Sequence, residues 1–295
     1  MVSKFQILGF PDDLGVQNVG GRTGARLGPE SFRKVWAKLN GKIQLTPRCS
    51  QDLDVPMGPD IEANHAQASQ FTQTAAKNAE RLIAIGGGHD YAAPWIHGFS
   101  MAYRESRKTI GCLNIDAHFD LRSDQPKLTS GSPFFRAIDR GWIRPEHLVE
   151  FGIQDHCNAG PLWDYAKQKK IRTVPMHELR SGVAVKKFKS ELAMLRKKVD
   201  IVLLSLDLDA LAMAFAPGVS SPQTEGLTGS EIIEIAEIAG ADTKVASLGI
   251  FELAPPIDHG DQTVRLAAQV TWHFLAAGFS GLGNRGLATS RTRKK

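Results

Sequence analysis

Three short apolar segments of this chain each end in a cluster of carboxylate or imidazole side chains. The run Thr109–Ile115 is typical of a buried strand and leads directly into Asp116, His118 and Asp120. Alternate residues of an extended segment point to the same side, so these three side chains can converge. Burying unpaired charge is costly, and a bound cation is the usual remedy. For this stretch alone, a polar loop at a strand end remains an open alternative.

Two further segments repeat the pattern. The run Ile201–Leu206 is followed by Asp207 and Asp209, and the run Leu82–Ile85 is followed by three glycines and His89. In an open parallel sheet, sites form at the carboxyl ends of the strands. Three strand ends would therefore bring six candidate ligands to one edge: His89, Asp116, His118, Asp120, Asp207 and Asp209. Such ligands suit manganese, iron, cobalt or zinc, and their number favours two ions with bridging carboxylates.

Strand-like and helix-like patterns alternate along the 295 residues, without an internal repeat. This alternation predicts one three-layer α/β domain around a mostly parallel sheet. We expect the glycine-rich stretch 12–29 to be a loop, with Pro29 opening a helix, and a weak strand near residues 43–45. Further helices are expected at 61–81, 91–107, 186–198 and 260–278. The domain would span 1–280, with a disordered basic tail over 281–295.

The composition excludes several classes of protein. The net charge is +5, but four basic residues after position 290 supply most of it and leave +1 for the body, so no nucleic-acid-binding surface is indicated. No apolar run approaches about 18 residues, so we expect no membrane span and a cytoplasmic protein. The three cysteines are widely spaced and predict neither a disulfide framework nor a Cys-x-x-Cys metal site.

Taken together, the three strand-end motifs resemble the ureohydrolase (arginase–agmatinase) family. That family carries Gly-Gly-x-His, Asp-x-His-x-Asp and Asp-x-Asp turns in this order, and the match extends from Gly9 to about Phe274. The resemblance implies an eight-stranded parallel sheet in a three-layer α/β/α sandwich, two Mn²⁺ per chain, and hydrolysis of a carbon–nitrogen bond in a guanidine or amidine. It also implies a division of ligands, with His89 and Asp120 on one manganese, His118 and Asp209 on the other, and Asp116 and Asp207 bridging both.

Within the family, several stretches resemble the formimidoylglutamase branch, which acts in histidine degradation. These are Gly15–Asn18 with Gly21–Ala25, Asn114–Arg122, Gly152–Gln154 and Ala216–Ser220. Gly88 stands where arginases and agmatinases usually have Asp, and Arg122 stands where arginases have Asn. The Asp-Pro that commonly follows Asp-x-Asp is missing, which selects no substrate. The resemblance implies conversion of N-formimidoyl-L-glutamate and water to L-glutamate and formamide.

Two acids are the candidate catalytic residues. Asp120 is both a ligand and the best-placed proton shuttle. His156 is a possible second shuttle, although a structural or solvent-facing histidine explains it as well. Glu252 follows the last apolar strand, where the resemblance places a substrate-reading glutamate that would pair with the amidinium. An ion-paired or helix-capping acid is the alternative for Glu252.

The substrate would be a small amidine that carries carboxylates, and Arg122 could grip one of them bidentately. Weaker candidates for substrate contacts are Asn18, Arg22, Gln154 and Ser221, and a surface salt bridge would explain Arg22 equally well. Three rivals stay open: another ureohydrolase (agmatinase, arginase or guanidino-acid hydrolase), a non-catalytic metal-binding protein with the same fold, and a single-zinc deacetylase relative, which needs fewer ligands. We expect a homo-oligomer.

Overall fold

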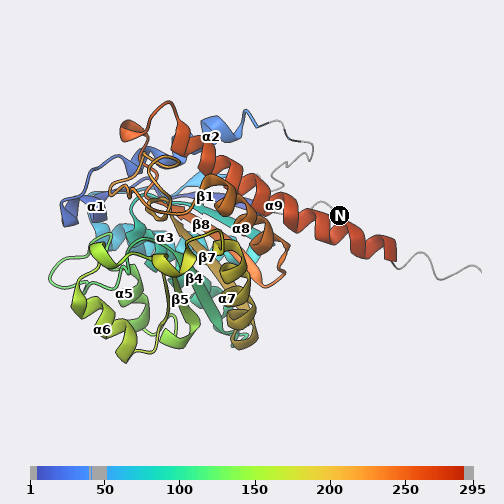
Figure 1. The fold of residues 1–295 in the computed structure, drawn as a ribbon, viewed down its shortest axis with the longest axis horizontal. Helices are drawn as coiled ribbons and strands as arrows, with labels where there is room; N and C mark the ends of the chain where they lie inside the picture. The colour runs from blue at the N-terminus through green and yellow to red at the C-terminus, as the bar shows by residue number, and fades with distance from the viewer. Residues whose placement is uncertain (1–4, 40, 42–51, 289–295) are drawn as a thin grey trace, which may run out of the picture.

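The computed structural model describes residues 5–39, 41 and 52–288, with side chains as far as residue 278. One sheet of eight parallel strands has the order β2-β1-β3-β8-β7-β4-β5-β6 (Figure 1). The strands are β1 (Phe5–Gly9), β2 (Leu53–Asp54), β3 (Arg81–Ile85), β4 (Ile110–Ile115), β5 (Leu148–Ile153), β6 (Arg172–Pro175), β7 (Ile201–Asp207) and β8 (Val245–Phe251). The eight-stranded parallel sheet is therefore confirmed.

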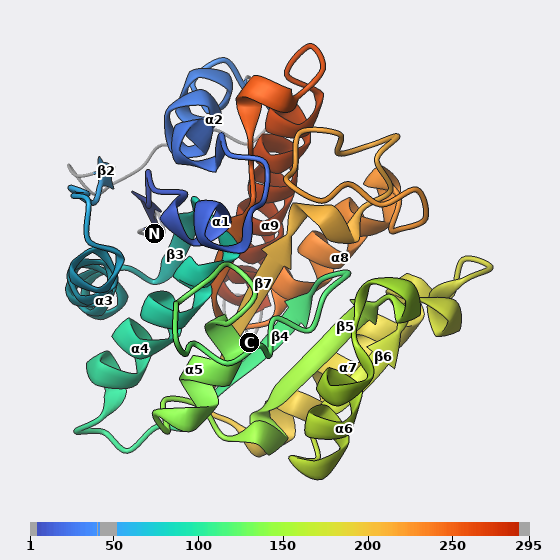
Figure 2. The ribbon, with the colours of Figure 1, turned by 90° about the vertical axis from the view of Figure 1, so that its left-hand side faces the viewer.

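Helices cover both faces of this sheet, because the side chains of each central strand alternate between two apolar layers (Figure 2). On β7, Val202 and Leu204 face one layer, whereas Leu203 faces the other. The first layer contains α2 (Gly28–Trp36), α7 (Ala184–Lys198), α8 (Gly229–Ala241) and α9 (Gln262–Ala288). The second contains α3 (Ile61–Asn78), α4 (Ala92–Tyr103), α5 (Pro133–Asp139) and α6 (Gly160–Gln168). The expected three-layer sandwich is confirmed.

Four neighbouring strands in the middle of the sheet end at the same edge. In the order β3-β8-β7-β4, Ile85 pairs with Ile250, and Leu206 pairs with both Ile250 and Ile115. Because these strands are parallel and in register, the residues that follow them emerge side by side. All the predicted metal ligands, and Glu252 after β8, come from this edge.

The glycines of the stretch 12–29 predicted a loop, but the structure has helical segments there. It contains α1 (Leu14–Val19), where the Asp12 carboxylate accepts a hydrogen bond from the Leu14 N–H at 2.8 Å. Gly20 ends this helix with φ 77°, in the left-handed conformation that glycine adopts easily. The glycine therefore works as a helix terminator, and the prediction of an unbroken loop was wrong.

Other boundaries differ from the predicted ones by a few residues. Helix α4 begins after a short 3₁₀ turn at His89–Tyr91 and ends at Tyr103, before the exposed polar residues 104–108. Helix α9 runs to Ala288, past the expected end at 278, although glycines at 281, 283 and 286 lower the helix propensity there. The strand expected at 43–45 lies outside the described residues. The domain boundary at 280 stays a prediction.

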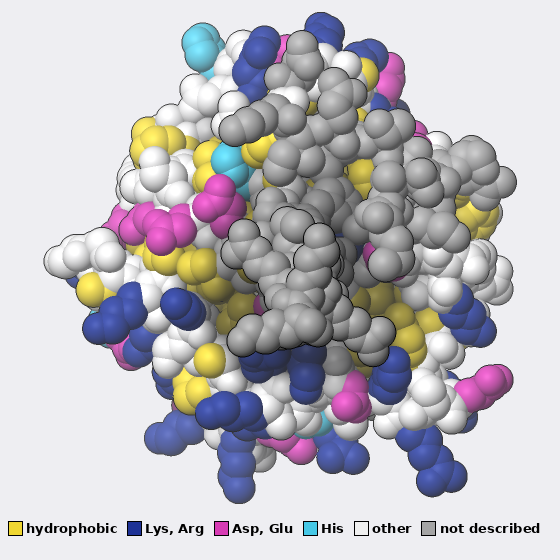
Figure 3. All heavy atoms as spheres, turned by 90° about the vertical axis from the view of Figure 1, so that its right-hand side faces the viewer, with side chains coloured by type: hydrophobic (Ala, Val, Ile, Leu, Met, Phe, Trp, Pro, Cys, Tyr) yellow, Lys and Arg dark blue, Asp and Glu magenta, His cyan; other side chains and the backbone are white. Residues whose placement is uncertain are grey.

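The surface carries charges of both signs. On the face drawn in Figure 3, lysine and arginine side chains lie mainly along the lower part, with acidic side chains between them. The basic outer face of α7 fits this pattern, because Lys187 pairs with Glu178 and Arg196 pairs with Asp242. Among the described residues, no helix has the length and apolar character needed to cross a membrane.

Candidate metal centre

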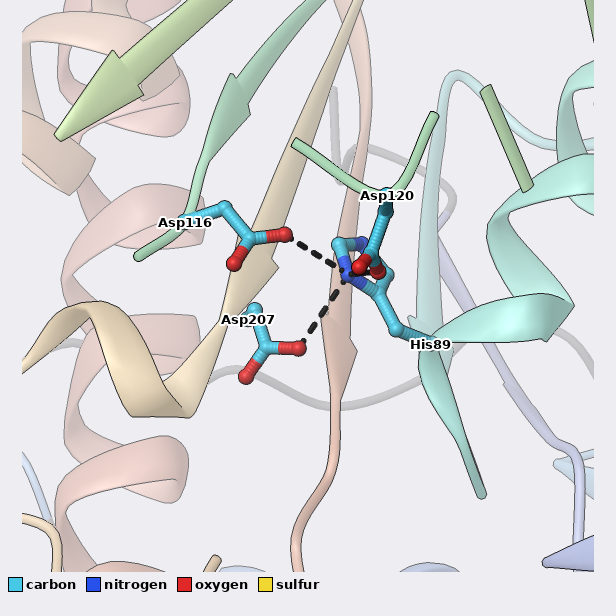
Figure 4. A group of neighbouring side chains, drawn as sticks. All are labelled: His89, Asp116, Asp120 and Asp207. Carbon is cyan, nitrogen blue, oxygen red and sulfur yellow. Dashed lines mark ion pairs between the residues drawn. The ribbon is translucent and has the colours of Figure 1, made fainter. Parts of the chain in front are cut away.

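The structure brings the six predicted ligands together at the edge of the sheet. One group contains His89, Asp116, Asp120 and Asp207, all buried, and their carboxylates converge on the His89 ring (Figure 4). A second group contains Asp116, His118 and Asp209. Because Asp116 belongs to both groups, the side chains are arranged as two adjoining binding sites that share a carboxylate.

His89 shows that the first group fits a cation. Its Nδ1 lies 3.0 Å from Asp116 Oδ2, 2.9 Å from Asp120 Oδ2 and 3.1 Å from Asp207 Oδ2. This buried nitrogen nevertheless makes no directed hydrogen bond. On the other side of the ring, Nε2 lies 2.9 Å from the Ser205 hydroxyl, which fixes the orientation of the imidazole. Three oxygens and one nitrogen aimed at one point are a donor set for a divalent ion.

The second group is more open. His118 Nδ1 lies 3.0 Å from Asp209 Oδ2 and 3.7 Å from Asp116 Oδ1, and the His118 side chain is 19% exposed, against 1% for His89. Backbone N–H groups hold the carboxylates in place: the His118 N–H donates to Asp116 Oδ1 at 2.7 Å, and the Asp209 N–H donates to Asp207 Oδ1 at 2.8 Å. Bridging by Asp207 stays a prediction, because this residue falls in the first group only.

Without cations, crowding of the acids perturbs their titration. Burial and the neighbouring Asp116 raise the pKa of Asp120 to about 6. Burial and Asp207 raise the pKa of Asp209 well above its usual range. Burial lowers the pKa of His89, but the carboxylates around it raise that pKa by more, so the net shift is strongly upward. The metal-free centre therefore holds protons that bound cations would displace.

The two candidate catalytic acids share an unusual backbone conformation. Asp120 has φ 49° and Glu252 has φ 61°, and both follow strands of the central sheet. A left-handed conformation at a residue other than glycine typically costs about 1–3 kcal/mol and persists only where the surroundings enforce it. Such strain clusters at functional sites, so the conformation supports the choice of these two acids.

Glu252 is held by the turn that carries His89. Its Oε1 accepts a hydrogen bond from the His89 N–H at 2.9 Å, whereas its buried Oε2 has no hydrogen-bond partner among the residues that the structure describes. Gly88 makes room for this arrangement, because a Cβ there would lie 2.4 Å from Asp90 Oδ1 and 3.5 Å from Glu252 Oε1. The Asp90 carboxylate thus occupies the space that a larger residue at 88 would need. Burial and Asp207 raise the pKa of Glu252 well above its ordinary value.

A cavity of about 390 Å³ opens above these residues. We call its acidic and imidazole side chains the floor, which consists of His118, Asp120, Asp207, Asp209 and Glu252. We call its loop residues the wall, which consists of Val19, Gly20, Gly21, Arg22, Arg122, Ser130, Gly131, Ser220 and Ser221. The volume suits a small molecule.

Three of the predicted substrate-binding residues belong to the wall. In the described part of the chain, the guanidinium of Arg122 makes neither an ion pair nor a side-chain hydrogen bond, and the residue is exposed. Arg22 donates through Nε to the Ser220 carbonyl at 2.9 Å and through Nη2 to the Val219 carbonyl at 2.7 Å. Within the described ranges Arg22 forms these carbonyl bonds and no salt bridge. Ser221 also lines the cavity.

The other predicted contacts lie elsewhere. Neither Asn18 nor Gln154 is among the described residues that line the cavity. Asn18 donates to the Leu128 carbonyl at 2.8 Å, and Gln154 donates to the Glu225 carbonyl at 2.7 Å. His156 is exposed and is likewise absent from the described lining. In the described structure, these three side chains therefore do not reach the cavity in which a substrate would bind.

Sequence reasoning missed the supports beneath the ligands. Ser205 on β7 orients His89, and Asn114 on β4 donates to Asp116 Oδ2 at 3.2 Å. Each lies two residues before a ligand of its own strand and points to the same face. A polar residue inside an otherwise apolar strand was the available signal. Ser130 and Ser220 were also missed, because nothing in their local sequence places them beside the cavity.

Comparison with known proteins agrees with this geometry. The chain matches the Arginase family over residues 3–277. It is 34% identical to a formimidoylglutamase of Staphylococcus aureus over 93% of this chain and 86% of that protein. Its fold is similar to a Trypanosoma cruzi formiminoglutamase structure with Mn²⁺ (26% identity, TM-score 0.82, 94% of each chain). It is also similar to a proclavaminate amidino hydrolase from Streptomyces clavuligerus (26% identity, TM-score 0.78, 95% of this chain and 92% of the other). With its ligand turns at the ends of β3, β4 and β7, this chain belongs to the arginase family.

Proposed function

We propose that the protein is a manganese-dependent hydrolase that converts N-formimidoyl-L-glutamate and water to L-glutamate and formamide. The observation that carries the proposal is the free Oε2 of Glu252, a buried acceptor without a partner in a residue that lines the cavity. A buried acceptor without a donor is unfavourable, and an amidinium N–H would satisfy it. The relatives named formimidoylglutamase support the same substrate class.

The charge of the cavity also matches this substrate. The floor is acidic, whereas the wall presents the guanidinium groups of Arg22 and Arg122. Among the described residues, the Arg22 guanidinium bonds to neutral carbonyl groups alone, which do not compensate its positive charge. Formimidoylglutamate has a cationic amidinium at one end and two carboxylates at the other. An acidic floor and a basic wall would orient it with the amidinium carbon over the metal ligands.

The six ligands would hold two Mn²⁺, with His89 and Asp120 on one ion, His118 and Asp209 on the other, and Asp116 and Asp207 between them. Bound there, the two ions would supply the Lewis acidity that lowers the pKa of water toward neutrality. Glu252 would bind the amidinium N–H groups and orient the carbon for attack. Asp120 would take the proton released by the attacking water and deliver it to the departing nitrogen. The bond between that nitrogen and the formimidoyl carbon breaks.

The first rival is another ureohydrolase with a different substrate. The proclavaminate amidino hydrolase among the structural relatives shows that similar chains serve other compounds. Two guanidinium groups in the wall disfavour a cationic tail such as that of agmatine. The second rival, a non-catalytic metal-binding protein, is disfavoured by the complete ligand set and by the free carboxylate oxygen of Glu252.

A substrate panel on manganese-loaded enzyme tests the assignment. We expect kcat/KM for formimidoylglutamate to exceed that for agmatine, arginine and guanidino acids. Arg122→Ala should lower kcat/KM for formimidoylglutamate by about 10- to 150-fold, since a hydrogen bond to a charged group contributes about 1.5–3 kcal/mol. Arg122→Lys should recover little, because an ammonium group cannot reproduce the planar fork.

The matched control is agmatine hydrolysis by the same variants, which should not fall with Arg122→Ala. If the wild type hydrolyses agmatine or arginine faster than formimidoylglutamate, the substrate assignment is wrong. We also propose that the protein is cytoplasmic and forms a homo-oligomer. Its mass in solution, measured by light scattering, tests the oligomeric state.

A further inference from the structure

A row of polar side chains crosses the sheet directly beneath the metal ligands. Asn114 on β4 pairs in register with Ser205 on β7 and with Glu150 on β5. All three are fully buried, and all lie on the sheet face that packs against α4 and α5. Ser205 contacts His89, and Asn114 contacts Asp116. No hydrogen bond or ion pair joins Glu150 to a ligand in the part of the chain that the structure describes, so its place in this row needs another explanation.

The hydrogen bonds of Asn114 define its orientation. Its Nδ2 donates to Asp116 Oδ2 at 3.2 Å and to Glu150 Oε2 at 2.9 Å. Both partners are acceptors, so the amide nitrogen, with its two N–H groups, must face them. A flipped amide would set a carbonyl oxygen against the Asp116 carboxylate. Glu150 and Asp116 therefore fix together which way the Asn114 amide points.

In the described structure, no charged partner explains why a carboxyl group stands at position 150. Among the described residues no lysine or arginine pairs with it, and its Oε1 has no hydrogen-bond partner. Burial, opposed only in part by the Asn114 hydrogen bond, raises its pKa well above the ordinary value. A fully buried carboxyl group without a cation is unfavourable for the fold, which points to a role in the neighbouring centre.

We propose that Glu150 is a positioning residue: by accepting one N–H of Asn114, it aims the other N–H at Asp116 and holds that carboxylate for metal binding. The inference rests on the proposed metal centre but not on the identity of the substrate. Outer partners of metal ligands orient them, and losing such a partner typically lowers metal affinity by about 10- to 100-fold.

The test is manganese binding by chelator-treated protein, measured by calorimetry without substrate. Glu150→Met keeps the length of the side chain but removes the acceptor, and we expect it to weaken manganese binding by about 10- to 100-fold. Glu150→Gln keeps a carbonyl acceptor, so its affinity should stay within about threefold of wild type. Asn114→Ala should lose as much affinity as Glu150→Met, and combining the two should weaken binding no further.

Glu191→Met is the matched control. Glu191 is another buried glutamate, and it lies on α7 in the opposite layer. Its carboxylate accepts hydrogen bonds from Arg172 Nη2 at 2.6 Å and from Arg172 Nε at 3.0 Å. This variant should lower the melting temperature of the metal-free protein but leave manganese affinity unchanged.

The inference is overturned if Glu150→Met binds manganese like wild type, or if Glu150→Gln loses as much affinity as Glu150→Met. If Glu150→Met does not fold, undiminished affinity in Asn114→Ala overturns it instead. Failure of the wild type to bind manganese would refute the metal centre itself, and with it this inference.

Discussion

The floor of the cavity comes from the ends of buried parallel strands, whereas its wall comes from loops that are distant in sequence. On the floor and just beneath it, backbone N–H groups and neighbouring side chains direct carboxylates and imidazoles toward common points, as at the buried His89 Nδ1. Around the wall, polar side chains bond to backbone carbonyls, as Arg22 does to Ser220. A strand end thus presents its side chains for chemistry, while many polar side chains of a loop serve to hold the loop.

The difference predicts that changes in the floor act on the metal centre and that most changes around the wall act on local stability. Arg122 and Arg22 are exceptions in the wall: among the described residues, the guanidinium of Arg122 has no partner and that of Arg22 bonds to neutral carbonyls alone. The following experiments test this division.

The largest effect is expected from Asp207→Ala. This carboxylate approaches His89 Nδ1 at 3.1 Å and accepts the Asp209 N–H, so its loss disturbs both groups of ligands. Activity should fall on the order of 10⁴-fold or more, because the Lewis acidity of a bound ion contributes several kcal/mol. Metal analysis should show the loss of at least one ion. A fully active Asp207→Ala enzyme would falsify the site.

The next largest effect is expected from Glu252→Gln. The variant should keep its fold and both ions but lose a buried charge-assisted pair with the amidinium. Such a loss typically costs about 2–5 kcal/mol, or roughly 30-fold to several thousand-fold in kcat/KM. Steady-state kinetics and metal analysis on the same preparation measure both properties. Unchanged kinetics would mean that Glu252 only supports the His89 turn.

Manganese binding should depend steeply on pH. The pKa values of His89 and Asp209 are raised well above their ordinary ranges in the metal-free centre, so both groups hold protons above pH 6.5. A cation binds the deprotonated forms, so binding releases protons, and affinity rises with pH by about tenfold per unit for each proton released. Calorimetry at pH 6.5 and 8, in buffers of different ionisation enthalpy, counts these protons. An affinity that does not change with pH contradicts the electrostatic picture.

The smallest effects are expected from Asn18→Ala and Gln154→Ala. Both side chains donate to backbone carbonyls instead of lining the cavity. Each variant should lower the free energy of unfolding by about 0.5–1.5 kcal/mol, while kcat/KM changes by less than about threefold. Denaturant unfolding and kinetics together separate the two effects. A loss in kcat/KM above about tenfold would restore these residues as substrate contacts.

The same division explains what the sequence could predict. Asp116, His118 and Asp120 follow an apolar strand at a spacing of two, and parallel strands end at one edge, so local pattern was enough for the metal ligands. It was not enough for Asn18, whose partner lies 110 residues away, or for Arg22, whose partner lies 198 residues away. Such pairings depend on how loops pack in space.

The same limit applies to supports and to turns. Asn114 could be suspected from a polar position in an apolar strand, but its pairing with Glu150 requires the order and register of β4 and β5. The glycines of 12–29 suggested an unbroken loop, whereas Gly20 ends a helix that the Asp12 and Asp13 side chains help to hold. Glycine content predicts that the chain turns in this stretch. It does not predict the side-chain contacts that stabilise the short helix preceding the turn.

Titration of metal-free enzyme with manganese tests the central claim most directly, because it counts the ions that the six ligands can hold. Six ligands from three strand ends, with Asp116 common to both groups, predict two ions per chain and full activity only when both are bound. Saturation at one ion per chain, or full activity with a single ion, would contradict the two-metal centre.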